Sequence, residues 1–160
     1  MCGIGPVDAA AATARALAES RPDALLHVGI AGARGIEPPT IVIGAEARFC
    51  DSDSALVESR VLPDARLLAT ARAALPGALC LPIGTSARVG GTSGCDVEGM
   101  EGFAVLRAAA LAGVAALEVR VISNDVDEPD RGRWRFDDAL GALEQALPLL
   151  VDALGFLDRP

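Results

Sequence analysis

Short apolar runs alternate along the chain with stretches of helical periodicity. The apolar runs predict strands at Ala24–Val28, Thr40–Phe49, within 79–91 and at Ala115–Ser123. Ala-rich or amphipathic stretches predict helices at Pro6–Ser20, Asp64–Ala74, Glu101–Leu111 and from Asp137 to about Phe156. Strands that alternate with helices predict an α/β fold, a three-layer sandwich with a mixed, mostly parallel central sheet.

Two glycine clusters interrupt this pattern. Gly29–Gly32 is expected to form a turn after the strand Ala24–Val28, and Gly3–Gly5 is expected to end a strand of which almost nothing is present. Neither cluster has the three-glycine spacing of a dinucleotide-binding loop, which disfavours a Rossmann domain. Because the chain begins inside Gly3–Gly5, we expect the first strands of the domain to be missing and one sheet edge to be unpaired.

Composition and charge narrow the class of protein. The chain of 160 residues fits a single domain, 1–160, without repeats or linkers. A formal net charge of -8 disfavours binding to nucleic acid, and there is neither a basic amphipathic helix nor an apolar run long enough to span a membrane. We therefore expect a cytoplasmic protein that binds neither nucleic acid nor membrane.

Candidate metal ligands are too scattered to form a site. The four cysteines include no C-x-x-C pair, and His27 is the only histidine. The acidic run Asp125–Asp130 lacks the alternation and the glycine of an EF-hand loop, and Arg131 and Arg133 follow it directly. We expect no metal ion and no cofactor.

Three segments carry motifs in a recognisable order. Leu26–Ala33 contains G-x-A-G, Val97–Ala104 contains M-E-G-x-A, and Val119–Asn124 contains R-x-I-S-N. Together with the G-x-G of Gly3–Gly5, they resemble the nucleoside phosphorylase/nucleosidase superfamily over almost the whole chain. The Ser-Asn pair, with Trp134 ten residues after the Asn, resembles the futalosine hydrolase branch of that superfamily.

The resemblance implies an N-glycosidase with a nucleoside phosphorylase-like fold that lacks its N-terminal part. Glu101 should accept hydrogen bonds from ribose hydroxyls and Met100 should pack on the ribose face, although alone they could be a helix N-terminal acid and core filler. By the same resemblance Glu101 and Asn124 are catalytic, and the substrate-binding residues are Ile30, Ala31, Gly32, Glu98, Met100 and Ser123.

The identity of residue 124 bears on the base. Relatives that cleave 6-aminopurines have Asp at this position, whereas Asn124 cannot supply a proton but can donate its amide hydrogens to O6 or N7. A 6-oxopurine such as hypoxanthine therefore fits better than adenine. A one-residue slip or bulge in the strand would instead present Asp125.

The nucleophile is predicted from two positions. Related phosphorylases bind phosphate through an Arg and a hydroxyl residue where this chain has His27 and Ile30. Isoleucine cannot bind phosphate, and a neutral histidine is a weak substitute for a bidentate arginine. We expect His27 to be a hydrogen-bonded core residue and water to be the nucleophile.

The resemblance thus predicts hydrolysis of a 6-oxopurine nucleoside, namely futalosine to hypoxanthine and dehypoxanthine futalosine in menaquinone biosynthesis. The alternatives are a methylthioadenosine/S-adenosylhomocysteine nucleosidase and a catalytically inactive truncated relative. In the family, the segment before the G-x-G turn carries the acid that orients the attacking water. We expect the 160-residue form to be inactive by itself and to be a homo-oligomer or prone to aggregation.

Overall fold

The computed structural model describes residues 2–155. Its elements are α1 (Pro6–Ser20), β1 (Ala24–Ala33), β2 (Ile41–Phe49), β3 (Arg60–Val61), α2 (Ala65–Ala74), β4 (Leu79–Thr85), β5 (Val97–Gly99), α3 (Gly102–Leu111), β6 (Ala115–Asp125), a 3-10 turn (Arg131–Arg133) and α4 (Phe136–Ala153). Every predicted helix is present, and the predicted end of the last one, Phe156, lies outside the described residues.

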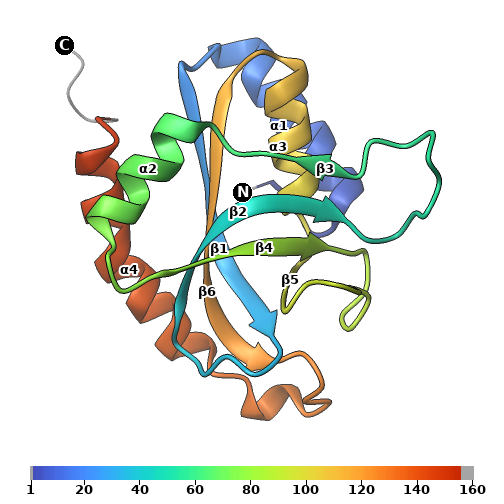
Figure 1. The fold of residues 1–160 in the computed structure, drawn as a ribbon, viewed down its shortest axis with the longest axis vertical. Helices are drawn as coiled ribbons and strands as arrows, with labels where there is room; N and C mark the ends of the chain where they lie inside the picture. The colour runs from blue at the N-terminus through green and yellow to red at the C-terminus, as the bar shows by residue number, and fades with distance from the viewer. Residues whose placement is uncertain (1, 156–160) are drawn as a thin grey trace.

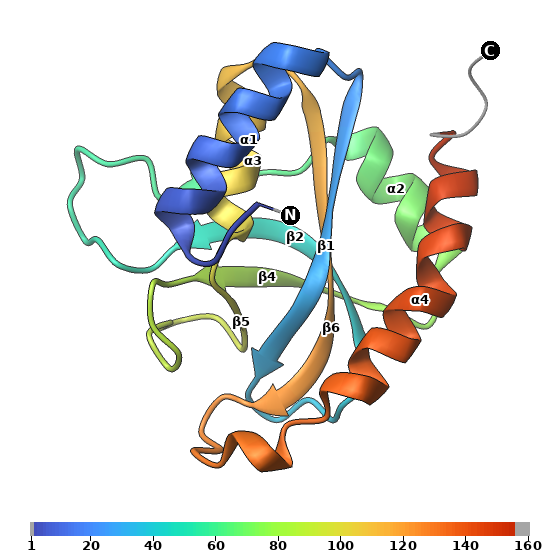
Figure 2. The ribbon, with the colours of Figure 1, turned by 180° about the vertical axis from the view of Figure 1, so that it is seen from behind.

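The strands form one mixed sheet between two pairs of helices (Figures 1 and 2). Its order is β3-β2-β4-β5-β1-β6, and β2 also pairs with β6, so that the sheet curls back on itself. The long β1–β6 and β2–β4 pairings are parallel. Helix α3 lies on one face with α1 packed against it, whereas α2 and α4 cover the other. The predicted α/β sandwich with a mostly parallel sheet is confirmed.

Strand β6 is the most deeply buried element. Its residues from 116 to 124 are all buried, which is typical of a strand covered on both faces. Small aliphatic side chains from β6, β2 and α4 fill the core on one side of the sheet, among them Ile43, Leu117 and Leu150. Two buried charged residues, Glu118 and Arg120, nevertheless lie within this strand.

The structure corrects the prediction for the glycine cluster Gly29–Gly32. Gly29–Gly32 is not a turn, because β1 continues to Ala33 and pairs with β6 along its whole length. Residues 2–5 contain no strand. Gly3 and Gly5 have φ angles of 85° and 87°, a left-handed conformation that favours glycine, and they lead directly into α1.

The side of β1 away from β6 is largely unpaired within residues 2–155. Along the side of β1 away from β6, only Gly32 and Ala33 pair with another described strand, β5. An apolar groove of about 1040 Å³ lies between α1 and α3, and near it the side chains of Val7 and Leu111 are 78% and 73% exposed. The homo-oligomer remains a prediction.

No helix in the described part of the chain is long and apolar enough to cross a membrane.

Candidate active site

A pocket of about 210 Å³ lies where β1 and β6 end, beside the junction of β5 with α3. Ligands of α/β proteins commonly bind at this edge of parallel strands. The pocket lining includes all eight residues predicted from the sequence: Ile30, Ala31, Gly32, Glu98, Met100, Glu101, Ser123 and Asn124. It also includes five residues that were not predicted as site residues: Val89, Gly99, Arg120, Val126 and Trp134.

Three larger cavities lie elsewhere among the described residues. They are the apolar groove between α1 and α3, an open polar depression of about 830 Å³ around the end of β2, and a hollow of about 330 Å³ between the segment 61–64 and the end of α3. The smaller pocket is the better candidate, because it combines apolar walls with buried, converging polar side chains. No three Cys, His, Asp or Glu side chains within residues 2–155 are grouped so as to hold a metal ion.

A bulge in β6 determines which polar groups face the pocket. The β1–β6 register shifts between Ala31 and Gly32, so that both Ser123 and Asn124 reach the pocket lining. A Cβ atom on Gly32 would lie 3.0 Å from Nδ2 of Asn124, so glycine leaves room for the amide. Asp125 is exposed, and its carboxylate accepts a hydrogen bond from the backbone N–H of Asp127. The bulge therefore does not bring the Asp125 carboxylate into the pocket.

The amide of Asn124 is oriented by its neighbours. Its Nδ2 donates to the carbonyl of Asp125 at 2.9 Å, and its Oδ1 accepts from the hydroxyl of Ser123 at 2.8 Å. One amide hydrogen and one lone pair remain for a ligand.

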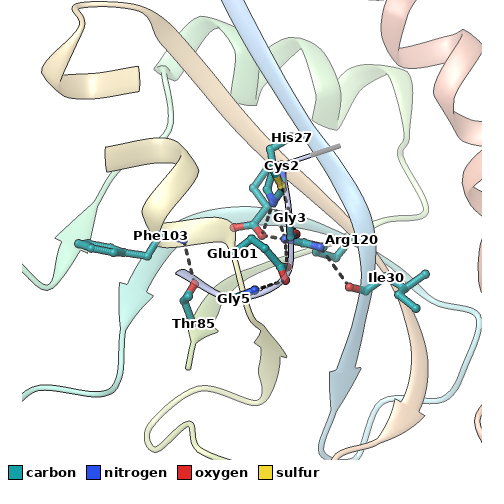
Figure 3. Close-up of polar contacts among 10 residues, drawn as sticks. Cys2, Gly3, Gly5, His27, Ile30, Thr85, Glu101, Phe103 and Arg120 are labelled. Atoms are coloured by element: carbon teal, nitrogen blue, oxygen red, sulfur yellow. Dashed lines mark hydrogen bonds and ion pairs between the residues drawn. The ribbon is translucent and has the colours of Figure 1, made fainter. Parts of the chain in front are cut away.

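Glu101 occupies the N-cap position of α3, but its side chain makes no hydrogen bond to the helix. Its Oε1 accepts from the backbone N–H of Gly5 at 3.2 Å, and its Oε2 accepts from Nη2 of Arg120 at 3.4 Å (Figure 3). The carboxylate is thus anchored from two sides, and each oxygen keeps lone-pair capacity for a hydroxyl group.

Arg120 connects the pocket to the core of the sheet. Its Nε donates to Oε1 of Glu118 at 2.7 Å, and its Nη1 donates to the carbonyl of Ile30 at 3.2 Å. A Cβ atom on Gly29 would lie 2.5 Å from Nη1, so a glycine at that position makes space for the guanidinium. Arg120 was not predicted from the sequence as a site residue. The feature that could have indicated it is a Glu and an Arg two residues apart in an otherwise apolar predicted strand.

His27 is a hydrogen-bonded core residue, as predicted. Its Nε2 lies within hydrogen-bond distance of Nη2 of Arg120. Because a guanidinium only donates, Nε2 must accept, and the ring is neutral. Burial, and secondarily the charge of Arg120, lowers the pKa of His27 from 6.5 to about 3.

Glu98 holds a neighbouring loop. Its Oε1 accepts from the backbone N–H of Gly90, and its Oε2 accepts from the N–H and hydroxyl of Thr92 at 2.9 and 2.7 Å. These bonds fix the loop that brings Val89 to the pocket. Direct contact between the Glu98 carboxylate and a substrate therefore remains a prediction.

Trp134 closes the pocket from the segment after β6. Its Nε1 donates to the carbonyl of Glu128 at 3.1 Å, and its ring lies against that of Phe136, with centroids 5.5 Å apart. The sequence motif drew attention to this residue, but no site role followed from it, because its distance from the other lining residues depends on the fold of the loop.

Comparison with known proteins agrees with the family resemblance of the sequence motifs. A sequence profile of the phosphorylase superfamily matches residues 1–154. The chain is 34% identical to a futalosine hydrolase from Streptomyces coelicolor, in an alignment that covers 95% of this chain and 77% of that protein.

Solved structures share the fold. A 5'-methylthioadenosine/S-adenosylhomocysteine nucleosidase from Colwellia psychrerythraea, in complex with adenine, matches with a TM-score of 0.85 at 19% identity, over 96% of this chain and 76% of that one. The futalosine hydrolase of Helicobacter pylori matches with a TM-score of 0.83 at 16% identity, over 94% and 77% of the two chains.

The neutral state of His27 gives a testable expectation. As the only histidine, it contributes one set of ring signals to NMR spectra, and these should not titrate between pH 8 and pH 5. The folded pKa lies below the unfolded value, so the unfolded chain binds the proton more readily below about pH 6.5, and stability falls as the pH decreases. Between pH 7.5 and pH 5, the free energy of unfolding measured with urea should fall by about 2 kcal/mol more in wild type than in His27→Gln. A ring that titrates near pH 6.5 would contradict the burial of an acceptor Nε2.

Proposed function

Because the chain belongs to the phosphorylase superfamily, we propose that it hydrolyses the N-glycosidic bond of a 6-oxopurine nucleoside of the futalosine type. The observation that carries the proposal is the pairing, in one pocket, of an anchored carboxylate, Glu101, with the oriented amide of Asn124. The futalosine hydrolase of Streptomyces coelicolor, which is 34% identical, supports the choice of substrate.

Glu101 is the group that serves the sugar. Cleavage of the C1'–N9 bond moves the bonding electrons into the base and leaves a ribose with oxocarbenium character. A carboxylate that accepts the ribose hydroxyls stabilises this positive charge, and it does so best when its position is fixed before the reaction. The bonds from Gly5 and Arg120 supply that fixation.

Asn124 is the group that serves the base. Its remaining amide hydrogen can donate to O6 or N7 of the purine, where negative charge develops as the bond breaks. A 6-aminopurine would benefit from a carboxylate that accepts from the amino group. The nearest candidate, Asp125, is exposed and engaged with Asp127, which argues against a methylthioadenosine nucleosidase.

Water is the proposed nucleophile. The position at which related phosphorylases have an arginine is His27, whose Nε2 is occupied by Arg120 and whose ring is neutral. Ile30 contributes an aliphatic side chain to the pocket lining. Neither side chain offers the charge-assisted bonds that hold phosphate.

The first test is a product assay with futalosine, inosine and methylthioadenosine, each with and without phosphate. From a form extended at its N-terminus, we expect hypoxanthine to be released from the 6-oxopurine nucleosides, at a rate that does not depend on phosphate, together with a free sugar hydroxyl at C1'. The 160-residue form is assayed in parallel and is expected to be inactive. A phosphate-dependent rate, or a preference for methylthioadenosine, would refute the proposal.

Asn124→Asp tests the assignment of the base. A carboxylate at this position accepts where the amide donates, so the ratio of kcat/KM for 6-oxopurine over 6-aminopurine nucleosides should fall by about 10-fold or more. Asp125→Asn is the matched control, and it should leave the ratio unchanged, because Asp125 is exposed and does not line the pocket. Equal ratios for wild type and Asn124→Asp would show that the amide does not take part in base recognition.

Glu101→Gln tests the assignment of the sugar. The amide keeps the shape of the side chain but loses its charge, so folding should survive while kcat/KM falls by roughly two to four orders of magnitude. Glu144→Gln, on the exposed surface of α4, serves as the control and should behave as wild type. Near-normal rates in Glu101→Gln would mean that this carboxylate has no role in the transition state.

A further inference from the structure

A second buried carboxylate lies behind the pocket, on the same strand as Arg120. Glu118 is 1% exposed and Arg120 is 4% exposed, and because they are two residues apart in β6 their side chains leave the same face of the sheet. Oε1 of Glu118 accepts from Nε of Arg120 at 2.7 Å, whereas its Oε2 has no hydrogen-bond partner within residues 2–155. Burial raises the pKa of Glu118, and Arg120 only partly opposes this.

Such an arrangement lowers the free energy of unfolding relative to an apolar core, which indicates a role other than stabilising the fold. A buried ion pair is often replaceable by apolar residues without loss of stability, and an unpartnered buried oxygen adds a further cost. The surrounding backbone nevertheless leaves room for this pair. A Cβ atom on Gly102 would lie 2.2 Å from the Glu118 carboxylate, and one on Gly29 would lie 2.5 Å from the guanidinium.

Glu118 determines the direction in which the guanidinium of Arg120 points. A guanidinium is planar and rigid, so fixing its Nε fixes the directions of both Nη groups. With Nε held by Glu118, Nη1 is directed to the carbonyl of Ile30, and Nη2 is directed to Oε2 of Glu101 and to Nε2 of His27. The guanidinium thereby connects a carboxylate outside the pocket to one that lines it.

We propose that Glu118 is a positioning residue, which holds Arg120 so that its guanidinium orients the Glu101 carboxylate toward the ribose hydroxyls. Glu118 does not line the pocket and acts only through Arg120. The inference rests on the proposed hydrolysis for its effect on rate. The geometry that it requires can be measured without substrate.

The chain contains a matched control for this pair. Glu46 and Arg48 have the same spacing in β2 and form an ion pair at 2.6 Å, and Arg60 also donates to Glu46. The hydrogen bond from Arg60, followed by the influence of Arg48, lowers the pKa of Glu46, in contrast to Glu118. None of these three residues lines the pocket beside Glu101. Loss of the Glu46 carboxylate should therefore affect stability but not the site.

Two variants of Glu118 separate positioning from bulk stability. Glu118→Gln keeps an oxygen that can accept from Nε of Arg120, and kcat/KM should stay within about threefold of wild type. Glu118→Met has no strong acceptor, and kcat should fall by about 10²-fold with a smaller change in KM, because a displaced catalytic group weakens the transition state most. Glu46→Met should lower the midpoint of urea unfolding while kcat and KM remain as in wild type.

The substrate-free measurement is the ¹⁵N chemical shift of Nε2 of His27, the single histidine of the chain. This nitrogen accepts from Nη2 of Arg120, so its shift reports the position of the guanidinium. We expect a change in Glu118→Met and none in Glu118→Gln or Glu46→Met. If Glu118→Met does not fold, Arg120→Lys serves instead, because an ammonium cannot bridge Glu118 and Glu101 and should give the same loss of kcat.

The outcomes are distinguishable. An unchanged His27 shift in Glu118→Met would overturn the positioning of Arg120, whatever the activity. A changed shift with unchanged kcat would overturn the link from Arg120 to Glu101. A loss in Glu118→Gln as large as in Glu118→Met would overturn the role of the acceptor oxygen. If the form extended at its N-terminus releases no base from any nucleoside, the proposed function fails, and the shift still tests whether Glu118 holds Arg120.

Discussion

The guanidinium of Arg120 lies at the meeting point of β1, β6 and the start of α3, and the candidate site depends on how its charge is satisfied. Removing one partner from a buried ion pair typically costs about 3–5 kcal/mol, so the groups around such a charge are held together strongly. Glu118 from β6, Ile30 and His27 from β1, and Glu101 at the N-cap of α3 supply these groups. The floor of the pocket is therefore part of the core and not of a loop, which favours a preorganised site.

The parallel pairing of β1 with β6 makes this arrangement possible. Glycines at 29 and 32 leave space beside the strand for the guanidinium and for the amide of Asn124. The bulge opposite Gly32 directs two successive side chains, Ser123 and Asn124, to the same pocket, where regular alternation would send them to opposite faces. The backbone of β1 thus shapes the part of the site that is proposed to bind the base.

The site has separate groups for the two parts of the proposed substrate, the sugar and the base. The proposed placement, with Glu101 near the sugar and Asn124 near the base, matches the opposite charges that develop when a glycosidic bond breaks. The fold is shared with both the adenine-bound nucleosidase of Colwellia psychrerythraea and the futalosine hydrolase of Helicobacter pylori, so fold alone does not distinguish between their substrates. The proposed discrimination depends on the chemistry of residues 124 and 125.

The sequence by itself determined the α/β class, nearly all helix positions and the family, because these depend on local periodicity and on short motifs in a fixed order. It also identified eight residues that the structure brings into one pocket. It misassigned Gly29–Gly32 as a turn, because glycine signals a turn locally, whereas here it allows the close approach of Arg120 and Asn124 from a strand about 90 residues away in sequence.

Tertiary structure alone decided how Glu118 and Arg120 are paired and which of Asn124 and Asp125 lines the pocket. The sequence alone does not indicate what a charged pair in an apolar strand contacts. Only the folded chain places His27 and Glu101 beside Arg120. Likewise, a one-residue bulge reverses the direction of every side chain after it, and it arises from the register between two strands. Local sequence encodes the conformation of each segment, but hydrogen bonds between distant segments decide which side chains meet.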